Sequence, residues 1–209
     1  MIYLEYGLYR NGWEKRIDSG VITSLQNYLE GKKEQMPTLG NGVIISFVGI
    51  PAAGKTTMSE MLMTHLNCPR VAYGEMNNII NPEDSLDRQL RRDIIMGKFI
   101  PFVEGLTHGE CFIYDKGNDR DLELYEKMKS VSRGRLFIIA IDIPKDVAHD
   151  RIMARNNWQP NDHVEKLDFW IAQYDRFIAQ FEGDINLRLD GCNELEENWR
   201  KTQEALKFF

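Results

Sequence analysis

Four residues with a fixed spacing, Gly49, Gly54, Lys55 and Thr56, carry the clearest chemistry in the sequence. They satisfy the pattern G-x-x-x-x-G-K-[ST], in which glycines let the backbone approach phosphate oxygens without an obstructing Cβ. Backbone N–H groups of such a loop point at a triphosphate, the lysine reaches its β- and γ-phosphates, and the next hydroxyl binds Mg²⁺. The residues expected to contact the nucleotide are Gly49, Ala52, Ala53, Gly54, Lys55, Thr56 and Thr57.

Two carboxylates are expected to lie near this loop. Asp115 ends the apolar run 111–114, and Glu75 follows the short run 71–73. Because ligands of open parallel sheets gather outside the carboxyl ends of the strands, both side chains should face the loop. Asp115 would bind Mg²⁺ together with Thr56, directly or through water, and Glu75 would act as a base or orient an acceptor hydroxyl. The alternatives are a helix-capping aspartate and an exposed loop carboxylate.

Arg151 and Arg155 form a third candidate group. They lie four positions apart, so they would share one face of a helix, and they lead into the polar segment 156–162. Such arginines would close over the γ-phosphate and stabilise the charge that develops during transfer. The alternative is that they are solvated residues at a helix end.

The elements that must position these residues can be located by their hydrophobic pattern. A short β-branched run precedes the loop, and Met58, Leu62 and Leu66 follow it at helical spacing. Strands and helices then alternate to the end of the chain, which predicts an α/β fold of three layers, α/β/α, around a five-stranded parallel sheet. The expected strands are 43–48, 71–73, 111–114, 136–143 and 185–189.

Capping signals predict one further helix. Asn81 is a candidate N-cap with Pro82 at the first helical position, and Gly97 is expected to interrupt the helix. Its arginines would bind an anionic acceptor or form a solvated face. These arginines are Arg88, Arg91 and Arg92.

Residues 1–40 are expected to form an N-terminal appendage, and residues 41–209 the main domain with a lid-like loop near 151–163. Within the appendage, residues 22–29 have the spacing of a short helix that ends near Gly31. Aromatic and basic residues alternate near its start, which would suit base stacking. Packing on the main domain or on another subunit is favoured, because the spacing matches no nucleic-acid module.

The composition restricts the class of protein. The chain has 209 residues, a formal net charge of -6 and 43% hydrophobic residues, which suits one globular domain and argues against coating of long nucleic acids. The sequence has no apolar run long enough to span a bilayer and no signal-peptide pattern at its start, so no membrane contact and a cytoplasmic location are expected. The three cysteines, Cys68, Cys111 and Cys192, are expected to be buried free thiols.

The order of elements, with an arginine-bearing segment before a lid-like loop, resembles the nucleoside and nucleotide kinases of the phosphate-loop superfamily. The segment 99–106 through Tyr114-Asp115-Lys116 is similar to thymidylate kinases, as is 141–148 with the two arginines that follow. Lys116 stands where those kinases have arginine, and only Glu75 remains of their Arg-Glu-Pro-Gly segment. Val48 and Pro51 resemble the loops of adenylate kinases, polynucleotide 5′-kinases and zeta-toxin-like kinases instead, and the segment 114–118 resembles the last two of these groups.

The resemblance implies ATP-dependent phosphoryl transfer to a nucleotide or nucleoside, with ATP and Mg²⁺ as the bound groups. Lys55, Glu75, Asp115, Arg151 and Arg155 would be the catalytic residues, and Thr56 and Asp115 the metal ligands. A polynucleotide 5′-hydroxyl or a sugar hydroxyl is the alternative acceptor. An ATP-binding regulatory protein is the alternative of another class. The expected partner is a small-molecule acceptor rather than a nucleic-acid end, and a homodimer is compatible with the sequence.

Overall fold

The computed structural model describes residues 19–38, 40, 42–81, 86–115, 122–155 and 164–207. Within these residues the chain forms a five-stranded sheet in which all paired strands are parallel, in the order β2-β3-β1-β4-β5. This confirms the α/β fold class and the five-stranded parallel sheet. The strands are β1 (Ile44–Val48), β2 (Arg70–Ala72), β3 (Phe112–Asp115), β4 (Leu136–Asp142) and β5 (Ile185–Asp190).

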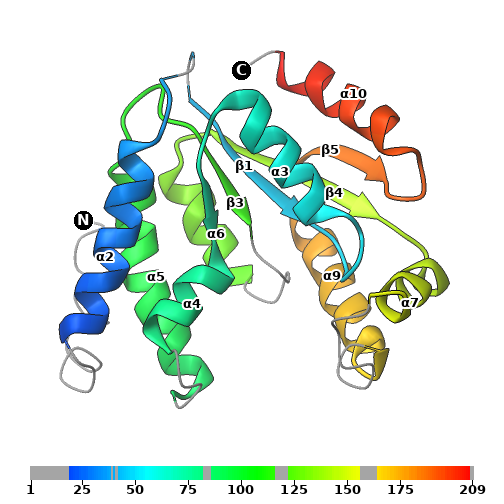
Figure 1. Cartoon of the computed structure of the whole chain (residues 1–209), viewed down its shortest axis with the longest axis horizontal. Coiled ribbons are helices and arrows are strands. Elements are labelled where there is room, and N and C mark those ends of the chain that lie inside the picture. The colour runs from blue at the N-terminus through cyan, green and yellow to red at the C-terminus, as the bar shows by residue number, and fades with distance from the viewer. Residues whose placement is uncertain are drawn as a thin grey trace.

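Helices cover both faces of the sheet (Figure 1). Helices α3 and α10 pack on one face, and the other helices pack on the opposite face or beyond it. The helices are α2 (Ser19–Glu34), α3 (Lys55–Leu66), α4 (Tyr73–Ile80), α5 (Arg88–Glu104), α6 (Leu122–Val131), α7 (Lys145–Met153), α9 (Leu167–Phe181) and α10 (Leu195–Leu206), with a 3₁₀ turn at Glu182–Asp184.

The central strand β1 is buried on both of its faces because successive side chains point to opposite sides of a strand. Ile44 is fully buried in the core on the α5 side, and the next residue, Ile45, is fully buried in the core under α3. Phe112 and Ile113 of β3 alternate in the same way. The unbroken apolar runs of the sequence therefore contribute side chains to two hydrophobic cores, one on each face of the sheet.

Helix α2 comes from the expected N-terminal appendage and packs against α4 and α5 (Figure 1). Its Leu25 and Leu29 are 0% and 3% exposed and belong to the main hydrophobic core. Burial of one such side chain contributes roughly 1.5–3 kcal/mol to folding. Helix α2 is thus packed on the main domain, as favoured above. The boundary at residue 40 stays a prediction, and the aromatic residues near the start lie outside the described residues.

The start of helix α5 was predicted wrongly. The helix begins at Arg88, because the Asp87 carboxylate accepts hydrogen bonds from the backbone N–H groups of Gln89 and Leu90, at 2.8 and 3.2 Å. Asn81, the expected N-cap, instead ends α4, and its Oδ1 accepts a hydrogen bond of 2.8 Å from the backbone N–H of Leu86. Both residues have capping chemistry, so local signals alone did not distinguish them.

The interruption expected at Gly97 is also absent, since α5 runs through Gly97 and Pro101 to Glu104. A proline inside a helix costs about 3 kcal/mol. Phe99 and Val103 are both fully buried on the face of α5 that meets the core. Their burial offsets the local penalty and keeps the helix continuous.

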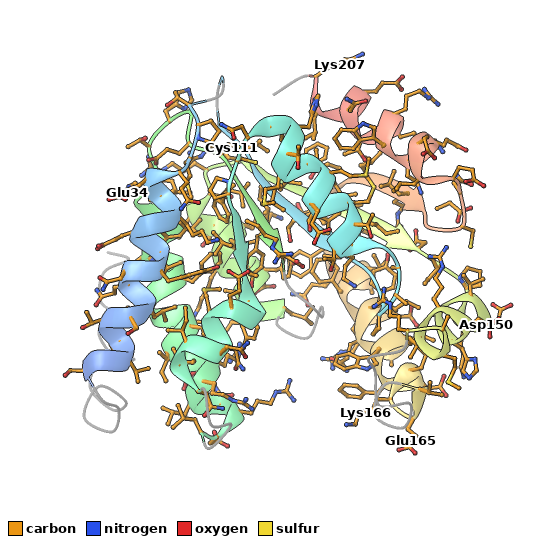
Figure 2. The ribbon with its side chains drawn as sticks, in the orientation of Figure 1. Glu34, Cys111, Asp150, Glu165, Lys166 and Lys207 are labelled. Carbon is orange, nitrogen blue, oxygen red and sulfur yellow. The ribbon has the colours of Figure 1, made fainter. Side chains whose placement is uncertain are left out.

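Cys68 and Cys111 are buried free thiols, as predicted, whereas Cys192 is free but exposed. Cys111 directly precedes β3, at the end of that strand opposite Asp115 (Figure 2). Among the described residues, no helix combines the length and the apolar character needed to cross a membrane.

Candidate active site

The loop between β1 and α3 has the backbone geometry of an anion site. Gly49, Ala52 and Gly54 have positive φ angles of 154°, 67° and 101°. A Cβ at Gly49 would lie 2.6 Å from the carbonyl oxygen of Ile141, so only glycine fits there. Helix α3 begins directly after Gly54, and its first backbone N–H groups have no partner within the helix. The loop therefore offers N–H groups and a helix dipole to a phosphate group.

Lys55 lies inside this loop and is only 7% exposed. Its Nζ donates hydrogen bonds to the carbonyl oxygens of Gly49 at 2.6 Å and Ile50 at 2.9 Å. These bonds hold a positive charge at the centre of the loop, where a triphosphate would meet it. The remaining residues of the predicted nucleotide set share the same loop and helix start: Ala52 and Ala53 are buried, and Thr56 and Thr57 are exposed on the first turn of α3.

Asp115 ends strand β3, as predicted, and its side chain is 13% exposed. Arg70 of the neighbouring strand β2 donates a hydrogen bond from Nη1 to Oδ2 of Asp115, at 3.3 Å. Burial raises the pKa of the Asp115 carboxyl above its usual value, while the positive charges of Arg70 and Lys55 oppose that rise. The electrostatics thus connect the end of β3 to the lysine of the loop.

Glu75 lies in the first turn of α4 rather than in a loop. Its two oxygens have different partners: Oε1 accepts a hydrogen bond of 3.2 Å from Arg70 Nη2, and Oε2 accepts one of 2.8 Å from the hydroxyl of Tyr28. Lys32 Nζ lies 3.7 Å from Oε2. Burial alone would raise the pKa of Glu75, but the hydrogen bonds from Tyr28 and Arg70 and the positive charges of Lys32 and Arg70 outweigh it and lower the pKa below its usual value. Glu75 is therefore held as a carboxylate.

Arg70 joins the two predicted carboxylates, and the sequence reading did not identify it. The strand was expected to start at Val71, one residue later, and a lone arginine at a strand start carries no motif. Tyr28 was also missed, because it lies between the buried residues Leu25 and Leu29 on one helix and there has the pattern of a core residue. In both cases the role of the residue depends on a contact with a distant part of the chain, which a sequence pattern does not show.

Arg151 lies against the loop rather than free above it. Its Nη1 donates to the carbonyl oxygen of Ala52 at 3.3 Å, and its Nη2 donates to that of Gly191 at 2.8 Å. The preceding residue, Asp150, lies on the outer side of α7 (Figure 2). Arg151 thus links the nucleotide loop to the turn that follows β5.

The prediction that Arg151 and Arg155 share a helix face was wrong, because α7 ends at Met153. Arg155 is exposed, two residues beyond the helix. Of the lid-like loop predicted near 151–163, residues 156–163 lie outside the described residues, as does the segment 116–121. Closure of the two arginines over a γ-phosphate stays a prediction.

Among the arginines of α5, Arg92 forms an ion pair with Glu123 of α6. This pair joins two neighbouring helices and uses the guanidinium for a contact within the protein. Binding of an anionic acceptor by the arginines of α5 stays a prediction.

The described residues include no group of three or more His, Cys, Asp and Glu side chains that could bind a metal ion together. Mg²⁺ fits this donor set nevertheless, because it is usually bound by one or two protein oxygens, substrate phosphates and water. The Thr56 hydroxyl, at the start of α3, and the Asp115 carboxylate, at the end of the adjacent strand β3, supply such oxygens. Lys55 and the loop backbone fit the phosphates of ATP.

Comparison with known proteins gives similar chains that are kinases. No family model matches the chain. An adenylate kinase of Rickettsia africae (strain ESF-5) is 22% identical over 176 residues, which cover 79% of this chain and 78% of the relative. A gluconokinase from Sinorhizobium meliloti 1021 has a TM-score of 0.60 at 15% identity, over 80% of this chain and 93% of that chain. A shikimate kinase from Aquifex aeolicus vf5 has a TM-score of 0.56 at 18% identity, over 79% of this chain and 96% of that chain. These similarities establish a shared fold.

Proposed function

We infer that this chain, a member of the phosphate-loop kinase superfamily, transfers the γ-phosphoryl group of ATP to a hydroxyl group of a small molecule such as a nucleoside or a sugar. The observation that carries this proposal is the pair of carboxylates, Glu75 and Asp115, that Arg70 joins beside the nucleotide loop. A carboxylate assigned to the acceptor rather than to a metal ion, as Glu75 is here, accepts hydrogen bonds from hydroxyl groups, whereas it repels a phosphate. This charge pattern therefore favours an acceptor whose reacting group is a hydroxyl.

The proposed mechanism relies on positioning and electrostatics, which dominate phosphoryl transfer. Lys55 and the loop N–H groups would neutralise the β- and γ-phosphates, and Thr56 and Asp115 would hold Mg²⁺, which shields the phosphate charge. Glu75 would orient the acceptor hydroxyl and accept its proton. At the same time the acceptor oxygen would form a bond to the γ-phosphorus, and the bond from that phosphorus to the ADP oxygen would break. Arg70 would keep both carboxylates ionised for these roles.

Two side chains would complete the donor side. Arg151 would fix the loop through the carbonyl oxygen of Ala52, which lies between the two loop glycines. Arg155 would approach the transferred group from the segment that leads into the lid-like loop, where it would stabilise developing negative charge.

A nucleotide acceptor, as in the thymidylate-kinase-like prediction, is the second candidate. It is supported by the similarity to adenylate kinases over most of the chain. In this case the arginines of α5 would bind the acceptor phosphate, and Glu75 would contact its sugar.

A panel assay of ADP release tests the proposal. Nucleosides, sugars, nucleoside monophosphates and 5′-hydroxyl oligonucleotides are each offered with ATP and Mg²⁺, and the Lys55→Ala variant is the control. We expect turnover with an acceptor from the first two classes and a rate lower by orders of magnitude in the variant. Turnover with monophosphates alone would favour the second candidate. Tight ATP binding without turnover on any acceptor would instead support a regulatory protein.

A further inference from the structure

We propose that helix α2 forms part of the acceptor site, and that Tyr28 is a positioning residue that fixes the Glu75 carboxylate toward the acceptor. This inference rests on the proposed function, because it assigns Glu75 to the acceptor. It adds a residue from helix α2 to a site otherwise built from the loop, β2, β3 and α4.

The hydroxyl of Tyr28 both accepts and donates a hydrogen bond. It accepts a hydrogen bond of 3.2 Å from the backbone N–H of Ala72 and donates one of 2.8 Å to Oε2 of Glu75. A tyrosine hydroxyl has a single proton, so the bond to Ala72 leaves that proton directed at the carboxylate. The arrangement favours ionised Glu75 in one orientation.

The bond to Ala72 acts on the segment that carries Glu75. Ala72 is the last residue of β2 and the residue directly before helix α4. Among the described strands β2 lies at the edge of the sheet, so none of them pairs with the outward N–H of Ala72. Tyr28 supplies that partner and thereby holds the junction from which Glu75 projects.

Tyr28 is itself held in place by the packing of α2. Leu25 and Leu29, on either side of it, are buried in the core, and Lys33 donates a hydrogen bond of 2.9 Å to the carbonyl oxygen of Gly105. Lys32 Nζ lies 5.2 Å from the centre of the Tyr28 ring and 3.7 Å from Glu75 Oε2. The helix thus brings a hydroxyl and a positive charge to the same oxygen.

From Tyr28 the contacts continue to the nucleotide loop. Glu75 Oε1 accepts from Arg70, and Arg70 also donates to Asp115, whose carboxyl is influenced by the charge of Lys55. Among the described residues, the charged groups that act on Glu75 are therefore Lys32 on α2, Arg70 on β2 and Asp115 on β3. A change at Tyr28 should affect the acceptor side first, because Lys55 keeps its own bonds to the loop carbonyls.

The variant Tyr28→Phe tests the proposal, since it removes both hydrogen bonds and keeps the ring and the helix packing. We expect kcat/KM for the acceptor to fall about tenfold and KM for ATP to stay within twofold, because the lost bond involves a charged group. The matched control is Tyr174→Phe, which removes a tyrosine–carboxylate bond to Asp142 on β4, on the other side of the central strand. An equal loss in the control would overturn the proposal.

A double-mutant cycle separates positioning from a general loss of stability. If Tyr28 acts through Glu75, Tyr28→Phe should have no further effect on kcat/KM in a Glu75→Ala background. An equally large further loss in that background would contradict the assignment.

The carboxyl carbon of Glu75 provides a readout that needs no acceptor. Its NMR titration should show a higher pKa in Tyr28→Phe than in the wild type, because a donor to the ionised form is lost. For an active enzyme the acid limb of kcat/KM should move to higher pH with it. An unchanged titration would overturn the proposal, whereas a wild type without turnover on any acceptor would overturn only the proposed function.

Discussion

Nη1 of Arg70 lies 3.3 Å from Oδ2 of Asp115, across the neighbouring strands β2 and β3. The other nitrogen of the same guanidinium, Nη2, lies 3.2 Å from Glu75. One positive charge therefore stabilises the ionised form of both carboxylates. The charge of Arg70 matters most for Asp115, because burial raises the pKa of that carboxyl.

The variant Arg70→Met should move the pH dependence of activity. Without the positive charge, the pKa of Asp115 should rise further, and the pKa of Glu75 should rise as well. Each carboxylate functions in its ionised form, so activity is lost as pH falls through these pKa values. A higher pKa therefore moves the acid limb of kcat/KM to higher pH. The profile of initial rates from pH 4 to pH 8 measures this shift.

The control for Arg70 is Arg200→Met, which breaks an exposed ion pair with Glu204 on α10. Its pH profile should match that of the wild type. Superimposable acid limbs for Arg70→Met and the wild type would show that Arg70 does not govern either carboxylate.

The variant Lys55→Ala should slow catalysis by orders of magnitude and leave the fold intact. The lysine provides the positive charge inside the loop, and removing such a group costs on the order of 10²–10³ in kcat. The carbonyl oxygens of Gly49 and Ile50, which Lys55 now contacts, can bind water instead. ADP release measures the loss, and circular dichroism with thermal melting checks the fold. Full activity in this variant would refute the kinase assignment.

The variant Arg151→Ala should weaken ATP binding more than acceptor binding. The guanidinium links the carbonyl oxygens of Ala52 in the loop and Gly191 after β5, and both contacts lie on the donor side. Loss of a hydrogen bond to a charged group costs about 1.5–3 kcal/mol, which corresponds to roughly tenfold or more in affinity. Separate KM values for ATP and acceptor measure the effect. A change confined to kcat would favour the predicted role at the γ-phosphate instead.

The variant Gly191→Ala should disturb the same contact sterically. A Cβ at Gly191 would lie 2.4 Å from Cγ2 of Ile143 and 3.0 Å from the carbonyl oxygen of Ala53. Such overpacking costs about 1–3 kcal/mol and would shift the nucleotide loop. Chemical denaturation and ATP titration should both show the loss.

The matched control is Gly183→Ala, where a Cβ would meet nothing within 4 Å. Its free energy of unfolding should stay within about 0.5 kcal/mol of the wild type. Equal stability of the two variants would mean that the turn at Gly191 moves freely away from the loop.

Features encoded in short segments were predictable. The strand β1, the loop with Lys55 and the aspartate that ends β3 each depend on neighbouring residues, because side-chain alternation, glycine conformations and strand ends are local properties. The boundaries of α5 were not predictable in this way. Asn81 and Asp87 compete as caps, and burial of the face around Phe99 carries the helix past Pro101.

By itself the sequence determined the parallel α/β fold, the nucleotide loop and the two carboxylates that follow strands. Only the tertiary structure revealed that Arg70 joins those carboxylates, that Tyr28 from α2 holds Glu75, and that Arg151 is bound to carbonyl oxygens. The physical reason is distance along the chain. Each of these hydrogen bonds joins segments that lie far apart in the sequence and are brought together by the order of the strands and the packing of the helices. A local sequence pattern cannot predict such contacts.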